Sequence, residues 1–181
     1  MPSLEGERVR LRALETRDAA ALFALHSDAQ VMRYWSFPAW TDTQQAVEQL
    51  ARVERDRALL ESWPWAATLR GDDALVGTCT LFGIQREHLR GVIGYALSRS
   101  LWGRGLATEM VQLALLHAFD VLGLERIEAD IDPHNHASCR LVERLGFRRE
   151  GYLRERWRVG GGIQDTALYG LLRREFTRGE H

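Results

Sequence analysis

Hydrophobic residues follow two different periods between Gly91 and Val121. The seven residues from Gly91 to Leu97 are β-branched, aromatic or small, which predicts a buried strand. After a short turn, apolar residues recur at steps of three and four, which predicts a buried helix that runs to Val121. The recurring positions are Leu106, Met110 and Leu113 on one line and Val111, Leu115 and Phe119 on another. The chain is therefore organised around a strand, a turn and a helix.

The remaining segments alternate between strand and helix patterns. Thr16 is expected to cap the first helix, because its hydroxyl can accept from the helix amides. The turn Gly71-Asp72-Asp73 predicts a hairpin, and Gly123 stands where a glycine typically ends a helix. The other predicted elements are strands from Glu7 to Arg12, Trp63 to Arg70, Leu75 to Phe82 and Arg126 to Asp132, helices from Ala19 to Ser27, from Thr41-Asp42-Thr43 onward and from His136 to Arg144, and a hairpin of Phe147 to Trp157 with Thr166 to Leu172. This order predicts an α/β sandwich with a largely antiparallel sheet, and a single domain over residues 1–181.

Composition narrows the possible chemistry. The chain has no lysine, which excludes Schiff-base and pyridoxal-phosphate reactions that need a lysine amine. A net charge of −1 without a long basic run argues against nucleic-acid binding. Neither a signal-peptide pattern nor an apolar run of membrane-spanning length is present, so we expect a cytoplasmic protein without a membrane partner. Cys79 and Cys139 are expected to be buried thiols, not a disulfide.

The turn before the central helix carries two glycines in Trp102-Gly103-Arg104-Gly105-Leu106-Ala107. A helix N-terminus presents unpaired amides and a positive dipole end, and glycines let an anion approach closely. The turn therefore suggests a diphosphate-binding loop, although a tight connection without a ligand explains it equally well. A Walker loop is excluded because lysine is absent, and Thr108 stands where a Rossmann fingerprint needs its third glycine.

Two motifs carry a family resemblance. The segment from Trp102 to Ala107 resembles motif A of the Gcn5-related N-acetyltransferases, Gln/Arg-x-x-Gly-x-Gly/Ala. Trp in the first position is similar to the RimJ/RimL-like branch of ribosomal-protein alanine acetyltransferases. Asn135-His136-Ala137-Ser138, followed by Leu145-Gly146-Phe147, resembles motif B of the same family. The resemblance implies a mixed, mostly antiparallel sheet of six or seven strands, with a splay between the central strands and helices on both faces.

The resemblance implies acetyl-CoA as the cofactor. Its pantetheine arm would meet the main chain of Tyr95, Ala96 and Leu97, because an amide-rich arm can extend a sheet whose next strand has splayed away. The expected diphosphate-binding residues are Trp102, Gly103, Arg104, Gly105, Leu106, Ala107 and Thr108. Asn135 would contact cofactor or substrate at the mouth of the splay, and it also suits a helix N-cap.

The resemblance also suggests catalytic roles. The backbone N–H of Leu97 would stabilise the oxyanion. Many relatives use a tyrosine acid where this chain has Val142, so Ser138 is the candidate proton donor, or else a residue that bonds the helix backbone or the cofactor sulfur. Asp130 is the candidate base, since neighbouring Glu128 and Asp132 would raise its pKa. One alternative is that these carboxylates only form ion pairs with arginines. Another is that no dedicated base exists, and that a chain of water molecules or a nearby histidine carries the proton away. No metal site is expected.

The expected reaction is direct acetyl transfer to a primary amine. The resemblance to the RimJ/RimL-like branch points to a protein N-terminus as acceptor, such as that of a ribosomal protein. The neighbouring carboxylates of Glu128, Asp130 and Asp132 would also suit a polyamine or aminoglycoside. Tyr34, Trp35 and Phe37 are candidate substrate contacts, or core residues between two helices. A non-catalytic acyl-CoA sensor and a longer-acyl transferase remain alternatives, and a homodimer is left open by these residues.

Overall fold

The structure is a computed structural model that describes residues 1–57 and 62–177. Its eight strands form one sheet in the order β1-β2-β3-β4-β5-β6-β8-β7. Neighbouring strands run antiparallel except for β5 and β6, which are parallel. The strands are β1 (Leu4–Glu5), β2 (Val9–Ala13), β3 (Trp63–Leu69), β4 (Leu75–Gln85), β5 (Arg90–Leu97), β6 (Arg126–Ile131), β7 (Arg148–Val159) and β8 (Gly162–Leu172). The sequence analysis did not predict β1, because two residues are too few to show a hydrophobic period.

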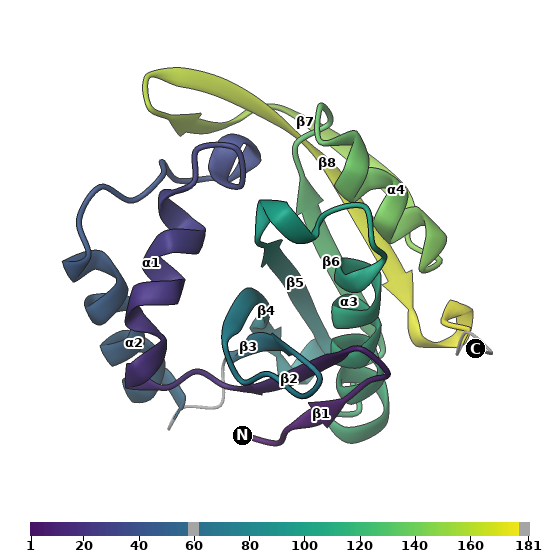
Figure 1. Cartoon of the computed structure of the whole chain (residues 1–181). Coiled ribbons are helices and arrows are strands. Elements are labelled where there is room, and N and C mark those ends of the chain that lie inside the picture. The colour runs from purple at the N-terminus through teal and green to yellow at the C-terminus, as the bar shows by residue number, and fades with distance from the viewer. Residues whose placement is uncertain (58–61, 178–181) are drawn as a thin grey trace.

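Helices cover both faces of this sheet, as the sequence predicted (Figure 1). The helices are α1 (Ala19–Ser27), α2 (Gln44–Arg57), α3 (Leu106–Leu116) and α4 (His136–Arg144). Alternation along β5 separates two buried clusters. Ile93 and Leu97 pack with α3 and α4, whereas Ala96 packs with α1 and α2. The predicted α/β sandwich is therefore confirmed, with the end of β5 lying between two helical layers.

The helix ends differ from the sequence prediction in two places. Thr16 is not the N-cap of α1, because it begins a 3-10 turn (Thr16–Asp18) that precedes the helix. The α-helical part of α3 ends at Leu116 and continues as a π-helical turn to Val121, so the predicted end at Val121 holds for the helical segment as a whole. Gly123 follows with φ +67°, which is the left-handed conformation that ends a helix. None of the described helices has the length and apolar character needed to cross a membrane.

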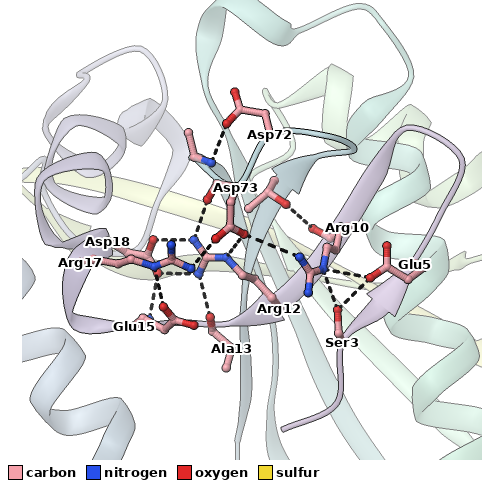
Figure 2. A network of polar contacts seen from close by, with 12 residues as sticks. Ser3, Glu5, Arg10, Arg12, Ala13, Glu15, Arg17, Asp18, Asp72 and Asp73 are labelled. Atoms are coloured by element: carbon pink, nitrogen blue, oxygen red, sulfur yellow. Dashed lines mark hydrogen bonds and ion pairs between the residues drawn. The ribbon is translucent and has the colours of Figure 1, made fainter.

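A buried ion pair fixes α1 to the sheet. Arg12 on β2 donates two hydrogen bonds to the Asp18 carboxylate, at 2.8 and 2.7 Å, and both side chains are about 95% buried, with exposed fractions of 5% and 4%. Arg12 also donates to the side chain and backbone carbonyl of Asp73, in the turn between β3 and β4. Figure 2 shows this network, in which Arg17 makes a further contact with Asp73. The network joins β2, the β3–β4 turn and the start of α1.

We predict that Arg12→Gln lowers the free energy of unfolding by about 3 kcal/mol or more, because Asp18 would keep a buried charge without its partner. Urea denaturation at neutral pH measures the change. The matched control is Arg10→Gln on the same strand, since the Arg10 side chain is 41% exposed and pairs with the exposed carboxylates of Glu5 at 2.9 Å and Asp73 at 3.8 Å. Each of these exposed pairs should contribute less than about 1 kcal/mol. Equal losses in the two variants would contradict the role given to the buried pair.

Candidate functional site

Strands β5 and β6 separate after a short parallel contact. They pair only where Arg90, Gly91 and Val92 meet Arg126, Ile127 and Glu128. Beyond this point β5 continues to Leu97 along β4, and β6 continues to Ile131 along β8. Each strand is therefore held on its outer side while the inner edges diverge. The result is a gap in the middle of an otherwise continuous sheet.

Beyond Val92, the backbone of β5 presents N–H groups to this gap that pair with neither of the described neighbouring strands, β4 and β6. Ser98 donates its amide to the Val76 carbonyl at 2.8 Å, so the strand bonds β4 at this residue. Successive residues of a strand direct their backbone N–H groups to opposite sides. The N–H groups of Tyr95 and Leu97 therefore face the gap, whereas the N–H of Ala96 faces β4. This differs from the sequence expectation that the main chain of Ala96 also meets the pantetheine arm. The indole of Trp102 donates to the Leu97 carbonyl at 2.7 Å, at the end of the strand.

The turn between β5 and α3 exposes a row of backbone amides. Gly103 and Gly105 have φ of +74° and +77°, which other residues rarely adopt. Among the described residues, no carbonyl or side chain accepts from the amides of residues 103–108. These amides lie at the positive end of the α3 dipole, and the turn from Gly103 to Gly105 is exposed. The turn therefore has the geometry of an anion-binding loop.

A clamp from the N-terminal strands supports this loop. The Glu109 carboxylate, in the first turn of α3, accepts from the backbone amides of Arg8 at 2.8 Å and Val9 at 3.0 Å. The Arg8 side chain donates to Glu109 at 3.1 Å and to the Arg104 carbonyl at 2.9 Å. A Cβ on Gly105 would lie 3.3 Å from the Arg8 guanidinium, so the two segments are closely packed. Sequence analysis missed Arg8 and Glu109, because no local pattern links residues so far apart in the chain.

The clamp also sets the charge of Glu109. Burial acts to raise the pKa of Glu109, but the hydrogen bonds from Arg8 and Val9 outweigh burial and bring the pKa below its ordinary value of 4.5. The carboxylate is therefore ionised at neutral pH, where it offsets the charge of Arg8. A groove of about 770 Å³ runs from the loop along α3, and its lining holds Arg8, Arg70 and Arg144 together with Glu5, Glu7 and Glu109. Charged side chains of both signs therefore line the groove beside the exposed amides.

Helix α4 begins at the other side of the gap. Asn135 caps it, because its side-chain oxygen accepts from the Ser138 amide at 3.2 Å. Ser138 is thereby held in the first turn, next to Cys139. Val142 is fully buried in the core between α4 and the sheet. The sequence motif around Asn135 therefore occupies the helix start that faces the ends of β5 and β6.

The three carboxylates of the β6 region have different environments. Glu128 pairs with Arg90 and Arg126, both at 2.8 Å, which is a structural ion-pair network. Asp132 accepts from the backbone amide of His134 at 2.8 Å and so fixes the turn after β6. Desolvation raises the pKa of Asp130, while Thr166 and Arg156 act against the rise and Glu128 adds little. Loss of solvation around the carboxylate, more than repulsion from Glu128, therefore raises the pKa of Asp130, although the residue is exposed at the surface. This cause differs from the sequence expectation.

Aromatic residues between α1 and α2 form one cluster around His26. The His26 ring lies 5.8 Å from Trp35, 6.1 Å from Phe37 and 4.4 Å from Trp40, measured between ring centroids. Burial lowers the pKa of His26 to about 4, so the ring is neutral at physiological pH. Tyr34 instead contacts Arg33, whose guanidinium lies 5.2 Å from the ring centroid. Trp35 and Phe37 thus belong to the packing of the helical layer.

Comparison with known proteins identifies relatives over almost the whole chain. Residues 8–148 match the family model described as Acetyltransferase (GNAT) domain. The chain is 34% identical over 176 residues to the uncharacterized N-acetyltransferase p20 of Bacillus licheniformis, covering 97% of this chain and 99% of the relative. It is 29% identical to spermidine N(1)-acetyltransferase of Escherichia coli, covering 97% of this chain and 91% of that protein.

A solved structure shares the same architecture. Mycobacterium smegmatis RimJ, in complex with CoA-disulfide, superposes with a TM-score of 0.85 at 25% identity, covering 98% of this chain and 89% of that chain. The fold implied by the two sequence motifs is therefore confirmed, with eight strands in the described sheet where six or seven were expected.

We predict that Glu109→Gln lowers the free energy of unfolding at neutral pH by about 1–3 kcal/mol, because one charged acceptor of three hydrogen bonds is lost. The folded-state pKa of Glu109 lies below the ordinary 4.5, so its stabilisation is complete above that value and is lost as the pH falls through the folded-state pKa. Urea denaturation of both proteins over this pH range measures the difference.

The control for this prediction is Glu7→Gln, an exposed carboxylate beside Arg8 in the turn between β1 and β2. This substitution should change stability little. The proposed clamp is wrong if Glu109→Gln and the parent protein differ as much in acid as they do at neutral pH.

Proposed function

Because the chain belongs to the GNAT acetyltransferase family, we propose that it transfers the acetyl group of acetyl-CoA directly to the primary amine of a protein or peptide N-terminus. The observation that supports this proposal most strongly is the gap between β5 and β6, which ends beside the exposed amides of residues 103–108. An amide-bearing chain with a diphosphate at one end matches both features. The gap supplies strand-like hydrogen bonds, and the loop supplies donors for the phosphates.

Acetyl-CoA supplies an activated thioester, and the chain supplies groups that hold and polarise it. The backbones of Tyr95 and Leu97 bind the pantetheine arm, and the amides from Gly103 to Thr108 bind the diphosphate. The Leu97 N–H points into the gap, where it can donate to the oxygen that gains negative charge. Asn135 fixes the start of α4, and Ser138 donates a hydrogen bond to the leaving sulfur.

Asp130 is the proposed base. Only a neutral amine attacks a thioester, so an ammonium must first lose a proton. Desolvation raises the pKa of Asp130 and thereby makes its carboxylate a better proton acceptor. Asp130 lies on β6 two residues beyond Glu128, the last residue paired with β5, and this location supports the proposed role.

The charges around the gap favour an acceptor with a single positive charge. Glu128 is neutralised by Arg90 and Arg126, and Arg156 acts electrostatically on Asp130. A polyamine would need several uncompensated carboxylates, whereas an N-terminal amine needs only one. The RimJ/RimL-like branch, a cytoplasmic location and a possible ribosomal-protein acceptor form part of this proposal.

The second candidate function is polyamine acetylation. The resemblance to Escherichia coli spermidine N(1)-acetyltransferase, over 97% of this chain, supports it. Kinetic measurements can distinguish peptide acceptors from polyamine acceptors. Polyamine binding depends on several charges, so the affinity for a polyamine should fall more steeply with salt concentration than the affinity for a peptide.

We predict that the protein releases CoA from acetyl-CoA faster with short peptides that begin with alanine or serine than with spermidine or spermine. A thiol-reactive dye measures the release, and mass spectrometry locates the acetyl group on the α-amine. The kcat/KM for peptides should exceed that for polyamines by about 10-fold or more. A ratio of this size corresponds to the free energy of about one favourable contact at the amine. Preference for the polyamines would overturn the peptide proposal, and binding of acetyl-CoA without any transfer would support the acyl-CoA sensor.

We further predict that Gly105→Asp binds CoA about 10-fold more weakly than Gly105→Asn, because the added charge lies next to the expected diphosphate. The two side chains have the same shape and tolerate the positive φ of Gly105 to a similar degree. Their comparison therefore isolates charge from backbone strain. Isothermal titration calorimetry with CoA measures both affinities, and equal values would contradict an anion-binding loop.

A further inference from the structure

The indole of Trp102 holds the carbonyl of Leu97, at the end of β5 where this strand lines the gap. Its N–H donates to the Leu97 oxygen at 2.7 Å, at the short end of the range for such hydrogen bonds. Trp102 is 48% exposed, so burial of its ring in the core does not explain where the side chain lies. The hydrogen bond to the strand is therefore the contact that requires an explanation.

The peptide group between Leu97 and Ser98 is held from both sides. Its N–H belongs to Ser98 and donates to the Val76 carbonyl on β4 at 2.8 Å. Its C=O belongs to Leu97 and accepts from Trp102 on the other side, because the N–H and C=O of a trans peptide point in opposite directions. The Leu97 carbonyl therefore points away from β4, toward the same side as the Leu97 N–H.

The hydrogen bond from Trp102 changes what the gap offers to a ligand at this residue. A strand residue at an open edge presents one donor and one acceptor, as the backbone of Tyr95 does. At Leu97 the carbonyl is already engaged by the indole, which leaves the N–H as the group available to a ligand. A ligand amide, which both donates and accepts, matches Tyr95. A thioester carbonyl, which only accepts, matches Leu97.

Both N–H groups of Trp102 are committed to the chain itself. The backbone N–H donates to the Arg99 carbonyl at 3.2 Å, within the turn after β5, and the indole N–H is bonded to Leu97. The sequence resemblance grouped Trp102 with the diphosphate-binding residues. In the structure, however, the amides without an acceptor among the described residues begin at Gly103. The geometry therefore connects Trp102 with the end of the strand and not with the phosphates.

We propose that Trp102 is a positioning residue, which engages the Leu97 carbonyl so that the end of β5 presents a hydrogen-bond donor to the thioester oxygen and no free acceptor. This inference rests on the proposed function and deepens it. When the amine attacks, an electron pair of the thioester C=O bond moves onto oxygen. The pair returns as the carbon–sulfur bond breaks and its electrons stay on sulfur, and the proton that sulfur gains is balanced by the one that the amine loses. A free carbonyl beside the charged oxygen would repel it, since both carry negative charge.

The test measures the thioester carbonyl itself, in a complex that contains no acceptor. Infrared difference spectroscopy of bound acetyl-CoA, labelled with carbon-13 at the acetyl carbonyl, reports the strength of the hydrogen bond to that oxygen. Trp102→Phe removes one of the two anchors of the Leu97 peptide, so the stretching band should move to higher wavenumber. In the full reaction kcat should fall about 10-fold, as expected for the loss of one hydrogen bond, while the Kd for CoA stays within about 2-fold.

Trp102→Gln is the matched variant, because its side-chain amide retains an N–H donor of similar reach without the aromatic ring. This variant should keep the band near its position in the parent protein, and kcat within about 3-fold. Trp65→Phe is the second control, since the buried Trp65 indole also donates to a backbone carbonyl, that of Pro2, at 3.1 Å. Its loss should lower stability in urea without moving the band.

Three results would overturn the inference. The first is a Trp102→Phe variant with the band position and kcat of the parent protein, and the second is an equal loss in Trp102→Phe and Trp102→Gln. The third is weaker CoA binding by Trp102→Phe with an unchanged kcat, because Trp102 would then act on the diphosphate. Absence of any calorimetric heat when the parent protein meets CoA would overturn the proposed function instead, so the two failures are distinguishable.

Discussion

The short parallel contact between β5 and β6 is the constraint on which the site depends. Three residues of each strand pair, and the inner edges then diverge while β4 and β8 hold the outer edges. A sheet interior normally satisfies every backbone group, so an open edge in its middle is costly unless something binds there. The N–H groups of Tyr95 and Leu97 are therefore available to a ligand without any rearrangement of the strands.

Two polar networks hold the helices beside this gap to the N-terminal part of the sheet. Arg12 and Asp18 tie α1 to β2 on one face, and Glu109 ties the start of α3 to Arg8 and Val9 on the other. Both networks involve β2, which pairs with β3, or Arg8 directly before it. A change in β2 can therefore reach the site through the positions of α1 and α3. This explains how residues early in the chain support groups near its middle.

The most regular segments were predictable from sequence. The strand ending at Leu97 and the helix beginning at Leu106 occur where the periods placed them, because both elements bury a continuous apolar face. The prediction for Thr16 was wrong because the Asp18 carboxylate bonds the Glu15 amide and Arg12, which turns the chain before the helix begins. Strand β1 was missed because two residues show no period. Local patterns thus fail where a distant partner or a very short element decides the structure.

The family, the order of the elements and the glycines of the loop before α3 can be recognised from the sequence alone, since these features depend on neighbouring residues. Only the tertiary structure showed that the backbone N–H of Ala96 faces β4, that Glu109 clamps the loop, and that the Tyr95 hydroxyl is buried. Each of these facts depends on strand register or on contacts between distant segments. Periodicity records which face of an element is buried, but it carries no information on which residue of another element lies opposite.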